Sequence, residues 1–354
     1  MKRIFLFFIF CASILCSWAH DFEVDGIYYD ITSSTDLTVS VTHRGSFYDS
    51  YSNEYSGAVT IPSSVIYNSK TYSVTSIGDG AFYSCSTLTS ITIPDGVTSI
   101  GASSFSGCSS LTSITIPEGV TSIGGGAFWN CSSLTAVHIK DIASWCNIDF
   151  GGFSSNPLCY AKNLYLNGEL VTELTIPNTI TSIKSFAFSS CSSLTAITIP
   201  EGVTSIGDDT FSGCSSLTSI TIPGGVTSIG KSAFCKCISL TSITIPEGVT
   251  SIGYGAFFGC SSLASITIPE SVVSIGYGAF DGTAWYDNHP EGLVYMDKVL
   301  YGYKGTMPEN MSIKVKGGTK VIAGGAFYEC NNLTNITIPE SVVSIGDCAF
   351  GGCI

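Results

Sequence analysis

The sequence predicts a right-handed, β-rich repeat solenoid built from 23-residue units with short strands. Cysteine recurs at this interval in Cys85, Cys108 and Cys131, and proline keeps the same step from Pro177 to Pro269. In addition, ten phenylalanines each follow an isoleucine by five residues. Two of the intervals between these phenylalanines exceed one unit, which indicates two insertions. The ten residues are Phe82, Phe105, Phe128, Phe188, Phe211, Phe234, Phe257, Phe280, Phe327 and Phe350.

One unit, with the sequence CSSLTSITIPEGVTSIGGGAF, begins at Cys108. Its segment LTSITI places Ile114 and Ile116 in alternation, as a strand with one buried face requires. The β-branched residues of this segment favour extended structure over helix. Pro117 ends the strand because it offers no backbone donor, and the Glu-Gly pair after it supplies a turn. The chain is therefore expected to reverse direction there.

The segment VTSIG is a second short alternating stretch, with Val120 and Ile123 as its buried members. The residues after it are expected to bring a phenylalanine and a cysteine inward through a tight turn or a single helical turn. One unit cannot bury both of its apolar faces, so the units must stack at strand spacing, about 4.8 Å per coil. Stacking places equivalent residues of successive units above one another, so each repeated position forms a buried column. Members of the cysteine and phenylalanine columns are Cys108, Cys131, Cys214, Cys260, Phe105, Phe128, Phe211 and Phe257.

The spacing L-x-x-I-x-I-P-x-x-V-x-x-I-x-x-x-A-F resembles the leucine-rich repeats of BspA-like bacterial surface proteins, over residues 59–354. Residues 20–58 resemble the N-terminal β-rich cap segment with which many such proteins begin. The segments at about 140–177 and 282–310 resemble variant units of such arrays and are expected to be longer coils. One departure is that Pro and Gly stand where ordinary leucine-rich repeats have an Asn or Cys ladder position.

Residues 1–19 are expected to be an export signal peptide. Lys2 and Arg3 precede an apolar stretch from Ile4 to Leu15, and Ser-Trp-Ala forms a small-x-small cleavage site before His20. The apolar stretch is short for a membrane span, and nothing later in the sequence is long enough for a transmembrane segment. We therefore expect a secreted or cell-surface protein. A lipid anchor at Cys16 is an alternative.

The balance of charge excludes one class of partner. The chain has 14 basic and 27 acidic residues and a formal net charge of −13. Proteins that bind nucleic acid need a basic footprint, so no nucleic acid partner is expected. The 44% of hydrophobic residues is enough for a continuous core.

The repeated cysteines have two interpretations. Stacked coils in an exported protein could form a disulfide or metal ladder. We favour free thiols packed as small apolar side chains, because each unit supplies one cysteine and the chain has no Cys-x-x-Cys pair. Cys146 and Cys159, which share one insertion, are the best candidates for a disulfide. No metal site is expected.

Catalytic residues are scarce. The histidines after the signal peptide are His20, His43, His138 and His289, and none of them belongs to a zinc-binding motif. His138 is expected to point outward from its strand, and Asp287 could orient His289. The sequence has neither a phosphate-binding glycine loop nor a G-x-S-x-G motif. We therefore expect a protein that is not an enzyme and has no cofactor.

Aromatic residues gather where the repeat is broken, and loops on a rigid scaffold are common places for recognition. An alternative is that these rings fill the core beneath a longer coil. The candidate binding residues are Trp145, Tyr160, Trp285, Tyr286, His289, Tyr301 and Tyr303.

The expected function is that of an exported interaction protein. Resemblance to BspA-like proteins implies adhesion, with proteins of the extracellular matrix or other bacteria as partners. The alternative is a glycan-binding module that uses the inserted aromatics, for which Trp285 and Tyr301 should be exposed and coplanar. The sequence stops at the cysteine of a unit, so we expect either a truncated product or another chain over that end.

Overall fold

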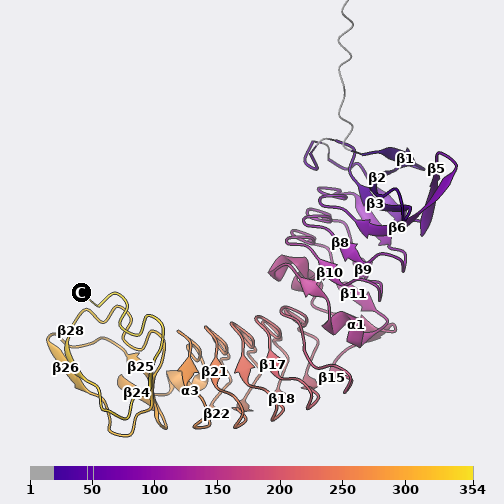
Figure 1. Cartoon of the computed structure of the whole chain (residues 1–354). Coiled ribbons are helices and arrows are strands. Elements are labelled where there is room, and N and C mark those ends of the chain that lie inside the picture. The colour runs from indigo at the N-terminus through magenta and orange to yellow at the C-terminus, as the bar shows by residue number, and fades with distance from the viewer. Residues whose placement is uncertain (1–19, 46, 51, 354) are drawn as a thin grey trace, which may run out of the picture.

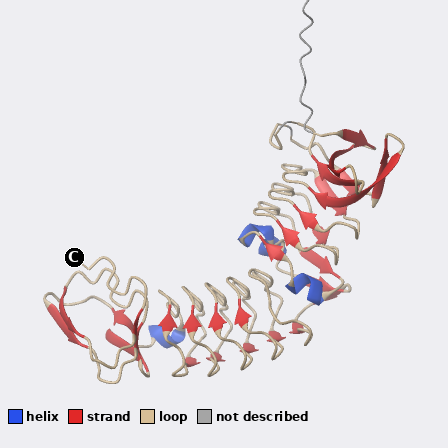
Figure 2. Ribbon diagram, viewed as in Figure 1, coloured by secondary structure: helices blue, strands red, loops and turns tan. Residues whose placement is uncertain are grey.

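The chain folds as one stack of coils, and the predicted repeat solenoid is confirmed (Figure 1). The structure is a computed structural model that describes residues 20–45, 47–50 and 52–353. The expected signal peptide, residues 1–19, lies outside the described residues. Most of the regular structure is short strand, and helix is confined to a few turns (Figure 2). Within the part of the chain that the structure describes, no helix has the length and apolar character needed to cross a membrane.

An N-terminal group of longer strands continues directly into the stack. Antiparallel pairs form its outer part, and the third strand then pairs in parallel with the strand that leads into the first coil. The open end of the solenoid is thereby covered by strands from residues before and within the first unit. These strands are β1 (Phe22–Val24), β2 (Ile27–Ser33), β3 (Thr38–Thr42), β5 (Ser64–Tyr67) and β6 (Lys70–Ile77).

Each regular coil contributes two strands to two separate parallel ladders. The first strand comes from the SIT segment and the second from the SI dipeptide that precedes glycine. The first strands are β4 (Gly57–Thr60), β7 (Leu88–Thr92), β9 (Ser113–Thr115), β11 (Ala136–Ile139), β13 (Leu164–Leu166), β15 (Glu173–Thr175), β16 (Ala196–Thr198), β18 (Ser219–Thr221), β20 (Ser242–Thr244), β22 (Ser265–Thr267), β26 (Met311–Lys314) and β28 (Leu333–Thr337). The second strands are β8 (Ser99–Ile100), β10 (Ser122–Ile123), β12 (Asp149–Phe150), β17 (Ser205–Ile206), β19 (Ser228–Ile229), β21 (Ser251–Ile252), β23 (Ser274–Ile275), β25 (Val299–Lys304), β27 (Val321–Ile322) and β29 (Ser344–Ile345).

The segment after the second strand is a turn in every regular unit, with no helix. The residue two before each repeated phenylalanine has a positive φ, as in Gly255 (+57°) and Ser232 (+50°). The residue two after it has a positive φ as well, as in Gly259 (+71°) and Lys236 (+58°). Two left-handed residues in one turn explain why glycine is so common there, since glycine adopts this conformation at little cost. Backbone hydrogen bonds between successive turns, such as Phe257 N to Ala279 O at 2.8 Å, connect the coils along a third line.

The core is a set of columns that run along the stack. Consecutive phenylalanine rings lie nearly parallel, with 5.2 Å between the ring centroids of Phe234 and Phe257 and an angle of 5°. In six of the described coils the cysteine donates a weak hydrogen bond to the phenylalanine carbonyl of the preceding coil, as from Cys260 Sγ to Phe234 O at 3.0 Å. Both residue types are buried along the stack, except in the last coils, where Cys330, Phe350 and Cys353 are partly exposed. The columns that the repeat predicts are therefore the core, and the thiols fill a polar role there as well as an apolar one.

Two insertions interrupt these ladders. The first contains α1 (Ile142–Cys146), β12, the 3-10 turn η1 (Phe153–Ser155), α2 (Leu158–Ala161) and β14 (Glu169–Leu170). The second contains α3 (Ala284–Asp287) and the hairpin of β24 (Gly292–Met296) with β25. The strand ladders end at each insertion and start again after it. In Figure 1 the stack turns at the first insertion, so the arms before and after it point in different directions.

Candidate functional site

Several aromatic residues of the insertions form hydrogen bonds to backbone groups where the strand ladders are interrupted. Trp145 is only 1% exposed, and its indole Nε1 donates to Ala187 O at 2.8 Å, in the coil that follows the insertion. The ring of Trp145 therefore fills the core at the bend, which agrees with the alternative that the inserted rings are core residues. The half-buried Tyr160 accepts a hydrogen bond from Asn130 N at 2.8 Å through its hydroxyl.

Tyr301 plays the same part at the second insertion. In regular coils the amide of the repeated phenylalanine donates to a carbonyl of the next coil, whereas Phe280 N donates to the Tyr301 hydroxyl at 2.9 Å. The hydroxyl in turn donates to Asp281 Oδ1 at 2.7 Å. Tyr301 is 5% exposed, so most of its ring belongs to the core, and only part of the side chain lines the pocket described below. The Tyr301 hydroxyl takes the place of the carbonyl oxygen that the next coil supplies in a regular unit.

Trp285 and His289 pack against each other beside Tyr301. The Trp285 and Tyr301 rings meet edge to face at 79°, and the Trp285 side chain is partly covered. The coplanar, exposed pair that the glycan interpretation required is therefore absent at these two residues. His289 Nδ1 lies 2.7 Å from Trp285 O. The sequence suggested that Asp287 orients the His289 ring, but in the structure this backbone carbonyl does so.

Lys304 closes the end of the short helix α3. Its Nζ donates to the carbonyl oxygens of Tyr286 at 3.1 Å, Asp287 at 2.6 Å and His289 at 2.6 Å. A cation at the carbonyl end of a helix is favourable because the last carbonyls lack helical partners. The insertion thus has its own fixed geometry, and Tyr286 and Tyr303 remain partly exposed on it.

An open groove lies next to this insertion, and residues of five repeat units line it. Its aromatic wall consists of Tyr254, Tyr277 and Tyr328. The Tyr254 and Tyr277 rings stack at 5.8 Å and 16°, and Tyr328 meets Tyr277 edge to face at 5.3 Å. The cavity has a volume of about 500 Å³, within the usual range of ligand pockets. Its lining residues, called the tyrosine groove from here on, include Tyr254, Tyr277, Tyr328, Ser251, Ser274, Lys231 and Asp347.

The tyrosine groove was missed in the sequence, although the repeat contains its signal. Tyr254 and Tyr277 occupy the position three before the repeated phenylalanine. Lys231 and Asp347 occupy the same position in other coils, and elsewhere it is Asp, Ala, Gly or Ser. The position varies while its neighbours repeat, which is where a solenoid can carry a specific surface. Alignment of the units by their phenylalanines would have found it.

A smaller pocket adjoins the groove and shares Tyr277 and Tyr328 with it. This pocket, called the Asp281 pocket from here on, has a volume of about 170 Å³. Burial, and after it the Asp281 carboxylate, raise the pKa of Tyr286 to about 12. Its lining side chains are Asp281, Tyr277, Tyr286, Tyr301, Tyr303 and Tyr328, with Ala326 and several glycines beside them.

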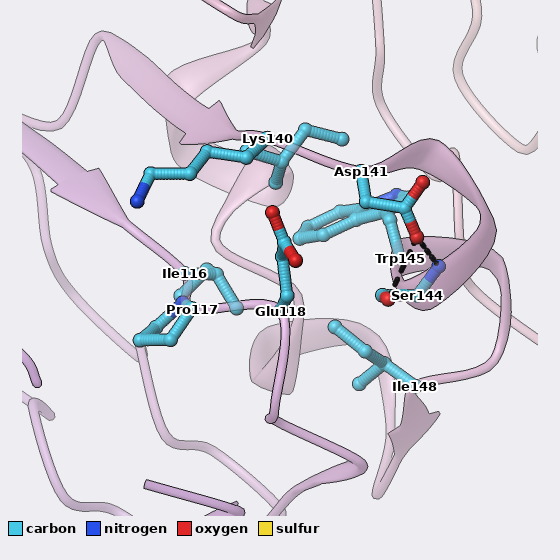
Figure 3. Close-up of a pocket in the computed structure, with 9 residues that line it drawn as sticks. Ile116, Pro117, Glu118, Lys140, Asp141, Ser144, Trp145 and Ile148 are labelled. Carbon is cyan, nitrogen blue, oxygen red and sulfur yellow. Dashed lines mark hydrogen bonds between the residues drawn. The ribbon is translucent and has the colours of Figure 1, made fainter. Parts of the chain in front are cut away.

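The cavity at the first insertion is too small for a ligand. It has a volume of about 10 Å³, about the minimum that a water molecule needs. Figure 3 shows Asp141 turned toward Ser144, to which it is hydrogen-bonded through both the backbone nitrogen and the hydroxyl, each at 2.7 Å. These bonds lower the pKa of Asp141 and cap α1. The carboxylate has a structural role there.

The cysteines of the described residues are all free thiols. Cys146 and Cys159, the candidate disulfide, are separately buried and unbonded, so this pairing is not found. Burial raises the pKa of Cys146 and of Cys131 to about 12. Among the described residues, no group of three His, Cys, Asp or Glu side chains is placed to hold a metal ion. His138 stacks on Tyr165 at 4.9 Å, on the outer side of β11.

Comparison with known proteins places these features in context. The model of the family described as BspA type Leucine rich repeat region matches six copies, over residues 63–158, 160–285 and 303–354. A leucine-rich repeat protein from Bacteroides ovatus is 26% identical, with 95% of this chain and 93% of that chain covered and a TM-score of 0.47. A leucine rich cell surface protein from Faecalibacterium prausnitzii is 26% identical, with 75% and 92% covered and a TM-score of 0.39. The leucine-rich repeat protein of T. pallidum is 26% identical, with 62% and 90% covered and a TM-score of 0.42. No curated protein matches the chain.

Proposed function

Because the chain belongs to the BspA-type leucine-rich repeat family, we propose that it is an exported, adhesin-like interaction protein that binds a host or microbial macromolecule. BspA-like repeat proteins are cell-surface proteins, and leucine-rich repeat proteins generally bind proteins. Such solenoids are typically non-catalytic. Residues 1–19 would supply the export signal, and the partner class would be proteins of the extracellular matrix or of other bacteria.

The tyrosine groove is the observation that carries this proposal. Tyrosine is enriched at the energetic centres of protein interfaces, because its ring buries a large apolar area and its hydroxyl still finds a partner. Tyr254 is 56% exposed although it lies on a rigid coil. Such a ring needs little ordering when a partner binds, which favours affinity.

Capture of purified extracellular-matrix proteins by the mature chain, from residue 20 onward, tests the proposal. Tyr254→Ala and Tyr328→Ala should each weaken capture at least tenfold. Trp129→Ala is the matched control, because Trp129 is 59% exposed on the other arm of the solenoid, and it should capture as the wild type does. The proposal fails if the wild type captures no matrix or bacterial surface protein, or if all variants capture equally. Trp145→Ala is unsuitable here because it would disturb the core.

A second candidate function is glycan binding at the same groove. The exposed ring of Tyr254 stacks on Tyr277 on one side, and the serine hydroxyls of Ser251 and Ser274 lie beside it. A sugar ring can pack on such an aromatic face and bond to such hydroxyls. A glycan array probed with the same variants distinguishes this candidate: selective glycan capture that Tyr254→Ala abolishes, without protein capture, would favour it.

A further inference from the structure

We propose that the Asp281 pocket binds the cationic side chain of a lysine or arginine presented by a protein partner. This inference rests on the proposed function, because it specifies the chemistry of the partner. The pocket combines one carboxylate with five tyrosine side chains and contains neither lysine nor arginine in its lining. Aromatic rings attract cations through their faces, and a carboxylate accepts charge-assisted hydrogen bonds from them.

The carboxylate is held in place before any ligand arrives. Asp281 Oδ1 accepts a hydrogen bond of 2.7 Å from Tyr301, whose hydroxyl is itself fixed by Phe280 N at 2.9 Å. Oδ2 lies on the side of Gly278, which lines the pocket and has no side chain to cover this oxygen. One oxygen therefore anchors the group, and the other lies beside Gly278, a residue of the pocket lining. Such a fixed acceptor loses little entropy when a donor binds.

The negative charge of Asp281 acts on the pocket. It contributes, after burial, to the raised pKa of Tyr277 and of Tyr286, whose side chains line the same pocket. The ion pairs of the described residues are Lys140 with Asp95 and Lys298 with Glu270. Neither involves Asp281, so no cation of the described chain is paired with it.

Lys304 is the lysine that could act as an internal partner for Asp281, but its ammonium group is bound to backbone carbonyls. Its Nζ bonds to three carbonyl oxygens of α3 and the residues after it, and lies 5.5 Å from the centroid of the Tyr286 ring. It is absent from the residues that line the pocket. The nearby carboxylate thus remains available to an external donor.

The surroundings favour a protein side chain over a metal ion or a free amine. Calcium and magnesium take several oxygen ligands, and here a single carboxylate is present. The pocket opens beside the tyrosine groove, with Tyr277 and Tyr328 common to both. A polypeptide can therefore place a basic side chain against Asp281 and a neighbouring apolar side chain along the groove. The acidic chain, with net charge −13, would also attract a basic partner.

Ligand-observed NMR with the whole mature chain tests this. The probes are Nα-acetyl-lysine amide, Nα-acetyl-arginine amide, the neutral Nα,Nε-diacetyl-lysine amide, and tetramethylammonium chloride. The lysine or the arginine probe should bind at least tenfold more tightly than the diacetyl probe. Asp281→Asn, which keeps an oxygen for Tyr301, should abolish this preference. Asp297→Asn, an exposed carboxylate of the same insertion outside the pocket, should leave it unchanged.

Three results would overturn the inference: equal binding of the charged and neutral probes, an unchanged preference in Asp281→Asn, or tightest binding of tetramethylammonium, which would indicate a quaternary ammonium site. If Asp281→Asn fails to fold, the comparison of charged and neutral probes on the wild type decides alone. Matrix capture without preference for the charged probes overturns only this inference. Preference for the charged probes without any capture overturns only the proposed function.

Discussion

The ring of Tyr277 lies directly on the backbone of Gly325, where any β-carbon would overlap the ring carbons Cδ2 and Cε2. Tyr277 belongs to both the tyrosine groove and the Asp281 pocket, so this contact sets the position of the ring on which both sites depend. The contact also joins the coil before the second insertion to the coil after it. A hydrogen bond from Gly324 N to Ile275 O at 2.8 Å joins the same two coils.

Gly325→Ala should therefore displace Tyr277 and weaken partner capture. Gly325 has a φ of +66°, so alanine also adds backbone strain there. We expect a loss of about 1 to 3 kcal/mol in the free energy of unfolding. Urea denaturation and matrix capture measure the two effects. Gly317→Ala is the control, because a β-carbon there meets nothing within 4 Å. Equal stability and capture for both variants would contradict the assigned contact.

Truncation of the phenylalanine column should be far more costly than truncation of its exposed neighbour. Phe234 is fully buried between Phe211 and Phe257, whereas Phe258 is 45% exposed. Phe234→Ala should lower the free energy of unfolding by about 3 to 5 kcal/mol, because it leaves a cavity in the column. Phe258→Ala should change it by about 0.5 kcal/mol or less. Urea titrations followed by circular dichroism compare the two, and similar losses would argue against the columnar core.

The repeat made the buried columns predictable, and the insertions limited what could be inferred about sites. A residue that recurs every 23 positions, such as Phe234, must occupy equivalent places in stacked coils, so its burial follows from the pattern. Trp145 and Tyr301 occur once each. Sequence alone does not reveal that a missing neighbouring coil leaves Ala187 O and Phe280 N in need of partners, which these side chains supply. Tyr277 could have been identified, because it stands at a position that varies between units while its neighbours repeat.

The buried thiols should make the fold sensitive to alkali. Burial raises the pKa of Cys131 from 9.0 to about 12, so the unfolded chain ionises first as pH rises. The stabilising effect of the neutral thiol is fully present below pH 9 and is lost as pH rises toward 12. At pH 10 the loss from Cys131 alone is about 1.4 kcal/mol. Urea denaturation at pH 7.5 and pH 10 measures it. Cys131→Ala should show a smaller drop between the two pH values than the wild type, and an identical drop would count against a raised pKa.

Tyr301→Phe isolates the hydroxyl that replaces the missing coil. The variant keeps the ring against Phe280 but leaves Phe280 N buried without its acceptor, and Asp281 Oδ1 without its donor. An unsatisfied buried group costs about 1 to 3 kcal/mol, so the free energy of unfolding should fall by that amount. Tyr303→Phe is the matched control, because Tyr303 is only partly buried, and it should stay within about 0.5 kcal/mol of the wild type. Amide hydrogen exchange at Phe280 gives the more specific readout. Exchange there should accelerate in Tyr301→Phe and stay slow in the control, whereas unchanged exchange in both variants would mean that the tyrosine does not substitute for a coil.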